Sequence, residues 1–246
     1  MRRRIVQAVN SLLAPFGARL VRTKPDTLDV TFAMPAAIRR IAEHDIPIRS
    51  IIDVGASDGT WSVKTMSTFP RACFLAIEPL HERQDALQRV KQKHDNFDYV
   101  LCVAGDKDGG EATLIVSEDL DGSTVDGAAG KPRTVSTRTI DSIVSEKALT
   151  GPFLLKFDTH GYEIPILAGA KDTLAKTNVI FMEVYNFNIT QHALRFPEMC
   201  SHMERLGFRC YDIVGPALRL YDRAFWQMDM LFTRSDSRIF SYSRYK

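Results

Sequence analysis

The sequence predicts an α/β fold with a mostly parallel sheet that is covered by helices. Apolar runs of strand length alternate along the chain with amphipathic segments of helical period, which is typical of parallel sheets. The composition fits, since 45% of the 246 residues are hydrophobic and 25% are charged. Successive apolar runs also end in an acid, at Asp53, Glu78, Asp158 and Glu183. Because the carboxyl ends of parallel strands meet at one edge of the sheet, we expect the ligand site there.

The expected elements follow from apolar spacing and turn residues. We expect strands at 50–55, 73–78, 98–104, 153–158, 179–184, 207–213 and 227–232, of which the last two form a closing pair. We expect helices at 32–42, 60–69, 82–93, 163–176 and 196–206. Residues 111–117 and 133–140 alternate in polarity and predict an inserted antiparallel β-hairpin. The glycine-containing loop between them, 118–131, is placed to cover a substrate site.

The first apolar run leads into a tight turn that indicates a nucleoside ligand. Its sequence is Asp53-Val54-Gly55-Ala56-Ser57-Asp58-Gly59, and the second run ends at Glu78-Pro79. Glycines let a ligand approach the backbone, and an acid at this place accepts hydrogen bonds from ribose hydroxyls. The turn lacks the full glycine set that seats a pyrophosphate on a helix N-terminus. S-adenosylmethionine (SAM) carries no phosphate, so the sequence predicts a SAM site and disfavours an NAD(P)-dependent oxidoreductase.

A second chemical motif follows the strand expected at 153–158. Its sequence is Asp158-Thr159-His160-Gly161, in which Gly161 permits a sharp turn. Methyl transfer to a hydroxyl requires a base, and histidine titrates near working pH, so His160 is the candidate. Asp158 could orient His160, hold the SAM ammonium or position the acceptor hydroxyl. A turn or helix-capping role is the alternative for His160, and we expect Glu163, in the first helical turn, to be structural.

Two further expectations concern the same strand ends. Lys156 lies within an apolar strand on the same face as Asp158, and a buried lysine needs a partner, which we expect to be Glu183. Asp158, His160 and Glu183 also offer oxygen and nitrogen ligands for a divalent metal. No paired acid or Asp-Asn spacing accompanies them, so the metal is an alternative that we do not expect.

The N-terminal part differs in charge from the remainder. We divide the chain into a basic segment, 1–31, and a domain, 32–246. Residues 1–24 contain arginine and lysine but no acid, and their apolar stretch is too short to span a bilayer. We expect an amphipathic helix that packs on the domain or on a partner subunit of a homo-oligomer. The alternative is peripheral contact of residues 1–24 with the inner face of an anionic membrane.

Charge and cysteine content bound the partners and the compartment. A formal net charge of +2 gives no ground for a nucleic-acid partner. The four cysteines (Cys73, Cys102, Cys200 and Cys210) have neither C-x-x-C nor zinc spacing. Cys73 and Cys102 fall in expected core strands, where a free cysteine acts as a small hydrophobe. These features predict a reducing, cytoplasmic environment.

Taken in order, the motifs resemble the FkbM-type SAM-dependent methyltransferases over roughly residues 50–233. They are Asp53-Val54-Gly55-Ala56-Ser57-Asp58-Gly59, Ala104-Gly105-Asp106-Lys107-Asp108-Gly109, Thr139-Ile140-Asp141-Ser142-Ile143 and Leu155-Lys156-Phe157-Asp158-Thr159-His160-Gly161-Tyr162-Glu163. The resemblance implies a Rossmann-like class I methyltransferase with a seven-stranded sheet whose last strand pair is antiparallel. It also implies O-methylation of glycans or other secondary metabolites. Where the family pattern has Asp-Val-Glu-Gly, this chain has histidine at position 160.

We therefore expect a SAM-dependent O-methyltransferase that acts on a sugar hydroxyl of a surface glycan or its precursor. A secondary metabolite, lipid or peptide acceptor is an alternative, as is a non-catalytic scaffold of the same fold. The expected catalytic residues are His160 and Asp158. The expected cofactor residues are Asp53, Gly55, Ala56, Ser57, Asp58, Gly59, Glu78, Pro79, Ala104, Gly105, Asp106 and Asp158, with Glu78 at the ribose and 104–106 beside the adenine.

Overall fold

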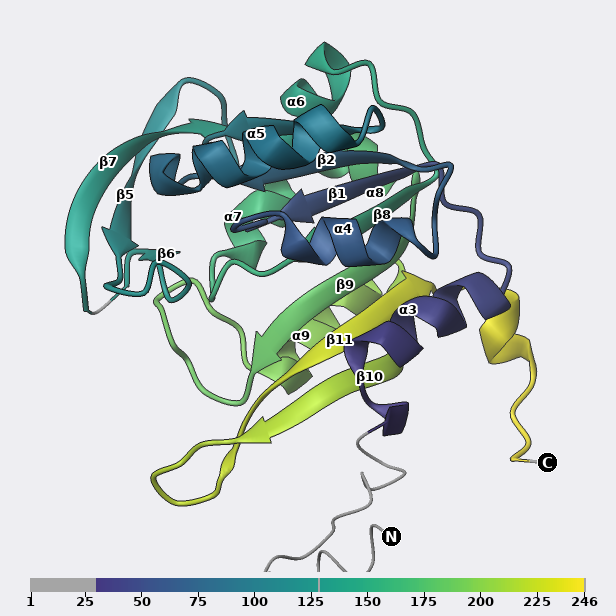
Figure 1. Cartoon of the computed structure of the whole chain (residues 1–246). Helices are drawn as coiled ribbons and strands as arrows, with labels where there is room; N and C mark the ends of the chain where they lie inside the picture. The colour runs from purple at the N-terminus through teal and green to yellow at the C-terminus, as the bar shows by residue number, and fades with distance from the viewer. Residues whose placement is uncertain (1–29, 128, 246) are drawn as a thin grey trace, which may run out of the picture. The chain divides into compact units, whose positions relative to one another are not determined.

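A seven-stranded sheet with the strand order β10-β11-β9-β8-β1-β2-β3 forms the centre of the structure (Figure 1). The computed structural model describes residues 30–127 and 129–245. The strands are β1 (Ser50–Val54), β2 (Cys73–Glu78), β3 (Phe97–Leu101), β8 (Phe153–Phe157), β9 (Thr177–Tyr185), β10 (Phe208–Leu218) and β11 (Phe225–Arg234). Strand β11 is antiparallel to both of its neighbours, and the other pairs are parallel. This confirms the predicted mostly parallel sheet with an antiparallel closing pair.

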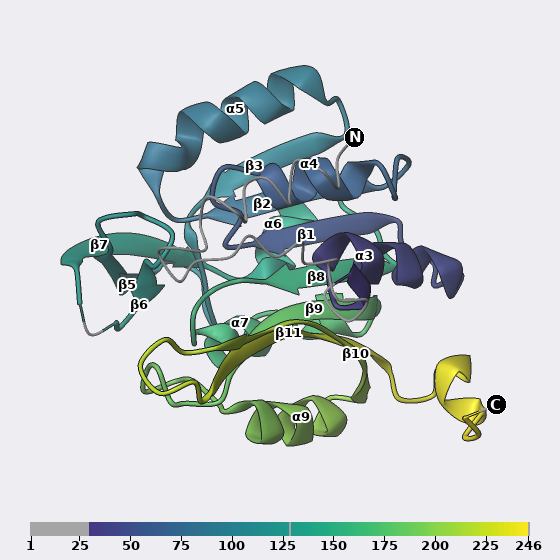
Figure 2. The same ribbon diagram turned by 60° about the horizontal axis from the view of Figure 1, so that its bottom comes forward.

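Helices cover both faces of this sheet (Figure 2). One face carries α3 (Met34–Glu43), α4 (Thr60–Met66) and α5 (Gln84–Lys93), and the other carries α6 (Ile140–Glu146), α7 (Glu163–Ala168), α8 (Lys171–Leu174) and α9 (Phe196–Arg205). Short 3₁₀ helices lie at η2 (His81–Arg83) and η3 (Arg238–Ser241). Each face has its own apolar core, so β1 is buried along its whole length. That position explains its continuous apolar run, since strands covered on both faces do not alternate in polarity.

A second sheet, of order β4-β7-β5-β6, lies at the end of the main sheet to which the β1 arrow points (Figure 1). Its strands are β4 (Val103–Ala104), β5 (Gly110–Val116), β6 (Thr124–Val125) and β7 (Lys131–Arg138). Strands β5 and β7 form the predicted antiparallel hairpin. A small apolar cluster that includes Leu80, Val103 and Leu114 joins this sheet to the end of β2. The insertion therefore makes a wall beside the carboxyl ends of the central strands.

Three predicted elements differ from the structure. The strand expected at 98–104 is divided at Cys102, because β3 belongs to the main sheet and β4 to the small one. The helix expected at 163–176 is interrupted at Gly169, where an added Cβ would lie 2.0 Å from the carbonyl oxygen of Gly105. The alternation expected to continue to 140 ends at Arg138. Helix α6 begins at Ile140 instead, because the Thr139 side chain caps it by accepting a hydrogen bond from the Ser142 amide.

The cysteine and membrane expectations have mixed outcomes. Cys102 is buried, but Cys73 is exposed at the start of β2, so its predicted place in the core is wrong. All four cysteines lie within the described residues and are free. No helix of residues 30–127 and 129–245 is both long and apolar enough to cross a bilayer. The expected N-terminal helix, with its membrane or subunit contact, lies outside the described residues.

Candidate active site

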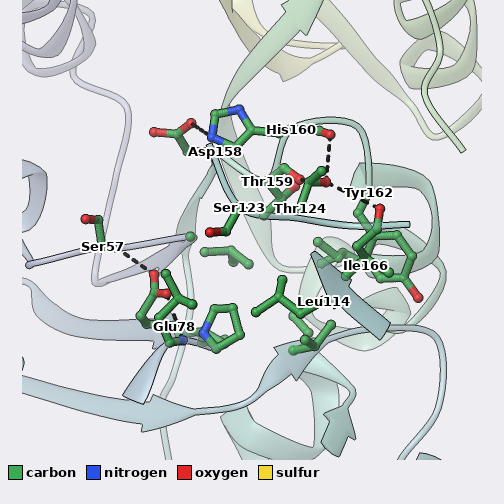
Figure 3. Close-up of a pocket in the computed structure, with 18 of the residues that line it drawn as sticks. Ser57, Glu78, Leu114, Ser123, Thr124, Asp158, Thr159, His160, Tyr162 and Ile166 are labelled. Atoms are coloured by element: carbon green, nitrogen blue, oxygen red, sulfur yellow. Dashed lines mark hydrogen bonds and ion pairs between the residues drawn. The ribbon is translucent and has the colours of Figure 1, made fainter. Parts of the chain in front are cut away.

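A pocket of about 340 Å³ lies at the carboxyl ends of β1, β2 and β8, beside the small sheet (Figure 3). It is lined by the turn after β1, by Glu78, by β4, by loop residues between β5 and β7, and by the segment after β8. This is the edge at which ligands bind in open α/β sheets. It is also the edge at which the sequence predicts the ligand site.

The turn after β1 depends on glycine. Gly55 has a φ of +74°, and an added Cβ would lie 2.0 Å from the carbonyl oxygen of Asp158. Any side chain at this position would push the β1 turn away from the end of β8. Gly59 also has a positive φ and forms the N-cap of α4. The absence of a side chain at Gly55 therefore brings the two strand ends together and leaves the backbone accessible from the pocket.

Glu78 is fixed by the backbone on both sides of the pocket. Its Oε2 accepts a hydrogen bond of 2.7 Å from the Ser57 amide, and its Oε1 accepts one of 3.0 Å from the Leu80 amide. Burial raises the pKa of Glu78 to about 7, although these amide hydrogen bonds and the charge of Arg83 oppose the rise. The carboxyl group lines the pocket and retains lone pairs that can accept hydrogen bonds from a ligand's hydroxyls.

Lys156 connects the two strand ends beneath the pocket. Its Nζ lies 3.0 Å from Asp53 Oδ1 and 3.2 Å from Asp158 Oδ2, and it donates to the Gly55 carbonyl oxygen at 3.2 Å. Burial opposes a charge here, but the two carboxylates outweigh it and raise the pKa of Lys156. The predicted pairing with Glu183 is wrong. In the β1–β8 register Asp53 lies directly opposite Lys156, which makes it the nearer partner.

The segment after β8 is a strained turn that directs His160 into the pocket. His160 has a φ of +51° and Gly161 a φ of +96°. The buried carboxylate of Glu163 accepts hydrogen bonds of 3.0 Å from the Gly161 amide and from Thr159 Oγ1. Glu163 therefore fixes the backbone that places His160, which is the structural role expected for it.

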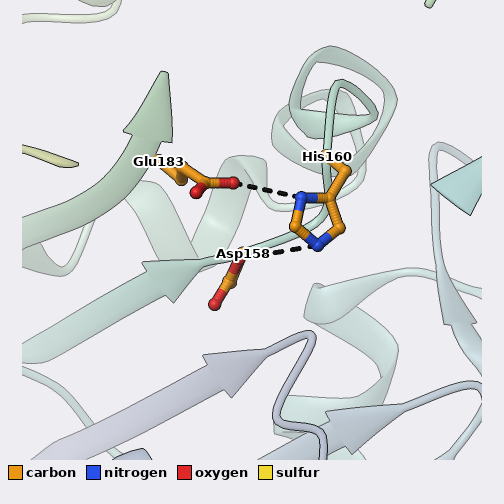
Figure 4. A group of neighbouring side chains, drawn as sticks. All are labelled: Asp158, His160 and Glu183. Carbon is orange, nitrogen blue, oxygen red and sulfur yellow. Dashed lines mark ion pairs between the residues drawn. The ribbon is translucent and has the colours of Figure 1, made fainter. Parts of the chain in front are cut away.

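The His160 ring lies between two carboxylates (Figure 4). Its Nδ1 is 3.1 Å from Glu183 Oε2 and 2.8 Å from the Tyr185 hydroxyl, and its Nε2 is 3.9 Å from Asp158 Oδ1. The Tyr185 hydroxyl donates to Glu183, as does the Gln227 amide. Burial by itself would lower the pKa of His160, but Glu183 and then Asp158 raise it to about 9.

The same cluster bears on the metal alternative. One ligand atom from each of Asp158, His160 and Glu183 lies within 4.8 Å of the others, so the spacing alone could admit a cation. However, Glu183 already receives hydrogen bonds from Tyr185 and Gln227 and lies beside His160. Protons already balance part of this negative charge. We therefore assign no metal ligands and keep the metal-free site as our proposal.

The loop between β5 and β7 closes one side of the pocket. The carboxylate of Asp121 accepts a hydrogen bond of 2.9 Å from Ser57 Oγ and pairs with Arg83, and its backbone oxygen lies 2.8 Å from His160 Nε2. Thr124 Oγ1 donates to the His160 carbonyl oxygen at 2.9 Å. Sequence reasoning expected this loop at the site but named none of its residues, because loop contacts leave no periodic pattern.

The predicted site residues fall into two groups. Those that line the pocket are Gly55, Ser57, Glu78, Pro79, Ala104, Asp158 and His160; those that do not are Asp53, Ala56, Asp58, Gly59, Gly105 and Asp106. Asp53 is fully buried and accepts a hydrogen bond from Ser62, and Asp58 accepts one from the Thr60 amide at the start of α4. Asp106 is exposed. Their places are thus beneath or beside the pocket. Sequence reasoning did not find Tyr185 and Gln227, which meet only through the register of β9 and β11.

Comparison with known proteins agrees with this geometry. The model of the Methyltransferase FkbM domain matches residues 53–210. A curated relative, 2-O-methyltransferase NoeI of Sinorhizobium fredii (strain NBRC 101917 / NGR234), is 27% identical over 155 residues. That match covers 54% of this chain and 62% of the relative, which is less than two thirds of its length.

Solved structures of similar fold are distant in sequence. The 1,6-didemethyltoxoflavin-N1-methyltransferase of Burkholderia thailandensis, solved with S-adenosylhomocysteine, is 11% identical with a TM-score of 0.46, covering 85% of this chain and 82% of that one. A SAM-dependent methyltransferase from Aquifex aeolicus is 12% identical with a TM-score of 0.44, covering 85% and 94%.

Proposed function

Because the chain belongs to the FkbM methyltransferase family, we propose that it is a SAM-dependent O-methyltransferase acting on a sugar hydroxyl of a surface glycan or its precursor. One observation carries the proposal. A single pocket joins a glycine turn and a backbone-fixed acid, suited to a nucleoside, with a carboxylate–imidazole cluster suited to a hydroxyl. The curated relative is named as a 2-O-methyltransferase, which supports a hydroxyl acceptor.

The residues present fit SAM. The Gly55 turn leaves backbone accessible where a Cβ would clash, and Glu78 offers an acceptor for ribose hydroxyls at the end of β2. Pro79 and Ala104 line the part of the pocket assigned to the adenine side. When bound, SAM supplies the methyl group. The protein's part is to align the acceptor, the methyl group and the sulfur, since well-oriented reactants account for much of such a rate enhancement.

His160 and Asp158 are the proposed catalytic residues. His160 Nε2 faces the pocket and takes the proton of the acceptor hydroxyl as the new oxygen–carbon bond forms. Asp158 is half-exposed beside it, with one oxygen held by Lys156 and the other directed to the ring, and it positions the acceptor. Glu183 holds the opposite ring nitrogen, so the ring's orientation is fixed before the acceptor arrives.

Calorimetric titration of SAM and of S-adenosylhomocysteine tests the cofactor site. We expect micromolar binding to the wild type, weakened about 10- to 100-fold in Glu78→Ala, because an acceptor for ribose hydroxyls is lost. Glu82→Ala is the matched control, since Glu82 is a nearby acid whose carboxylate pairs with Arg133 and does not line the pocket. Absence of binding to the wild type would overturn the methyltransferase proposal in favour of a scaffold of the same fold.

Methyl transfer from radiolabelled SAM to a panel of methyl glycosides tests the acceptor class. Transfer to a glycoside that His160→Ala abolishes supports the sugar hydroxyl. Transfer only to a lipid, peptide or secondary-metabolite acceptor would replace it. Cytoplasmic location, self-association and membrane contact through residues 1–24 remain our proposals from sequence.

A further inference from the structure

The hydrogen bonds around His160 assign a proton to each ring nitrogen. At Nε2 the neighbour is the backbone oxygen of Asp121, 2.8 Å away, which can only accept. At Nδ1 the neighbours are Glu183 Oε2, which accepts, and the Tyr185 hydroxyl, whose proton already goes to Glu183. Both nitrogens therefore donate. In this arrangement the ring is an imidazolium and has no lone pair with which to take a proton.

The charges around the ring agree with that assignment. The groups that face it are Asp158 after β8, Glu163 on α7, Glu183 and Tyr185 on β9, and Asp119 in the loop. The carboxylates favour the cation. To act as a base, His160 must first lose its Nε2 proton. The Asp121 carbonyl oxygen, which accepts that proton in a hydrogen bond, must also move away so that a hydroxyl can approach Nε2.

We propose that the carbonyl oxygen of Asp121 occupies the subsite of the acceptor hydroxyl, and that residues 118–123, which precede β6, move away to admit that hydroxyl. This inference rests on the proposed function and adds the location of the acceptor. The Asp121 oxygen lies at hydrogen-bond distance from Nε2, the place a hydroxyl must take to give up its proton. The subsite is lined by Asp121, Ser123, Thr124, Asp158 and His160.

The step moves one proton to His160 and one methyl group to the acceptor oxygen. Once the loop has moved away, the Nε2 proton can pass to solvent, and the form of the ring that reacts is the neutral one, with Nδ1 still donating to Glu183. The acceptor hydroxyl then donates to Nε2. Its oxygen bonds to the methyl carbon, the carbon–sulfur bond breaks with its electron pair on sulfur, and the hydroxyl proton moves to Nε2. That proton leaves to solvent when the product departs.

Residues 118–123 are held against the pocket mainly by the Asp121 side chain, whereas β6, which follows them, is paired with β5 and packs in the small apolar cluster. Asp121 is tied to Ser57 and Arg83 by its side chain, and Thr124 is tied to the His160 carbonyl oxygen. These groups are half-exposed or exposed, so their removal should leave the fold intact. Glu118 provides the control. It is an exposed acid in the same loop.

The experiment is nitrogen-15 NMR of histidine-labelled protein without SAM, combined with hydrogen exchange of the loop amides. In the wild type we expect a protected Nε2 proton on His160. In Asp121→Ala/Thr124→Val we expect that proton to exchange faster by more than about tenfold, together with loop amides, while Glu118→Ala resembles the wild type. Thr124→Val alone gives a second variant if the double variant is unstable.

Two results would overturn the inference. One is an Nε2 proton that exchanges freely in the wild type, and the other is a double variant whose Nε2 protection is unchanged although its loop amides exchange faster. Both are measured without SAM or acceptor. They are therefore separate from the calorimetric test, so the subsite proposal can fail while SAM binding succeeds, or the reverse.

Discussion

The two ends of the pocket are built in different ways. The end assigned to SAM uses a short stretch of chain, from the Gly55 turn to Leu80, and mostly backbone groups that fix Glu78. The end assigned to the acceptor uses side chains from the segment after β8 and from β9 and β11, together with the backbone oxygen of Asp121, and is centred on His160. A backbone-built end needs only glycine and one acid, whereas a side-chain-built end depends on every partner. Substitutions should therefore separate the two ends.

Lys156 is the exception, because it serves both ends. It pairs with Asp53 and the Gly55 carbonyl on β1 and with Asp158 after β8. Its side chain is almost completely buried, so neither Asp53 nor the lysine could find water as a substitute partner.

The largest expected effect is that of Lys156→Met on stability. Removing the cation leaves the buried Asp53 carboxylate uncompensated, which costs about 3–5 kcal/mol of unfolding free energy. Urea denaturation followed by circular dichroism measures it, with Lys64→Met on the exposed side of α4 as control. Equal unfolding free energies of Lys156→Met and Lys64→Met would show that the Lys156–Asp53 ion pair does not stabilise the junction between the two ends of the pocket.

His160→Ala should break the acceptor end alone. We expect turnover to fall about 10²- to 10⁴-fold, as for loss of a positioned base, with SAM affinity retained because Glu78 and the Gly55 turn are untouched. Radiolabel transfer and calorimetry on the same protein separate the two effects. His202→Ala is the control, since His202 lies on α9 beside Arg205 and does not line the pocket. Near-full turnover of His160→Ala across the pH range would show that His160 is not the base.

Glu78→Gln should alter the pH dependence of the SAM end. The pKa of Glu78 is about 7, so the wild type carries a proton there at pH 6 and mostly lacks it at pH 8. The ionised carboxylate accepts ribose hydroxyls better, and we expect affinity to rise by up to about tenfold over that interval. The glutamine variant should bind with little pH dependence. A wild-type affinity that is flat from pH 6 to 8 would contradict the assigned role of Glu78.

The same contrast explains what sequence alone could predict. The positions of the strands along the chain, the glycine turn and the strand-end acids depend on local pattern, so they could be expected. The partner of Lys156 could not, because alternation gives its face but not which neighbouring strand places an acid opposite it; register sets Asp53 there and Phe181 on the other side. Likewise Gln227 donates to Glu183 because the antiparallel register places Gln227 of β11 opposite Tyr185 of β9, two residues from Glu183. The acceptor end is an outcome of long-range register and loop packing.

The smallest expected effect is that of Glu183→Gln on His160. Losing the carboxylate at Nδ1 removes the main cause that raises the pKa of His160 to about 9, so the pKa should fall by about one unit or more. Because the pKa of His160 is higher in the folded state than in the unfolded state, protonation of His160 stabilises the fold. This stabilisation is complete below the unfolded pKa of about 6.5 and is lost as the pH rises through about 9. Thermal denaturation from pH 6 to 10 should therefore show an alkaline loss in the wild type that is smaller in Glu183→Gln. Glu204→Gln, an exposed acid on α9, is the control. An identical alkaline loss in all three proteins would mean that Glu183 does not control the protonation of His160, and the acceptor end would then need another organising group.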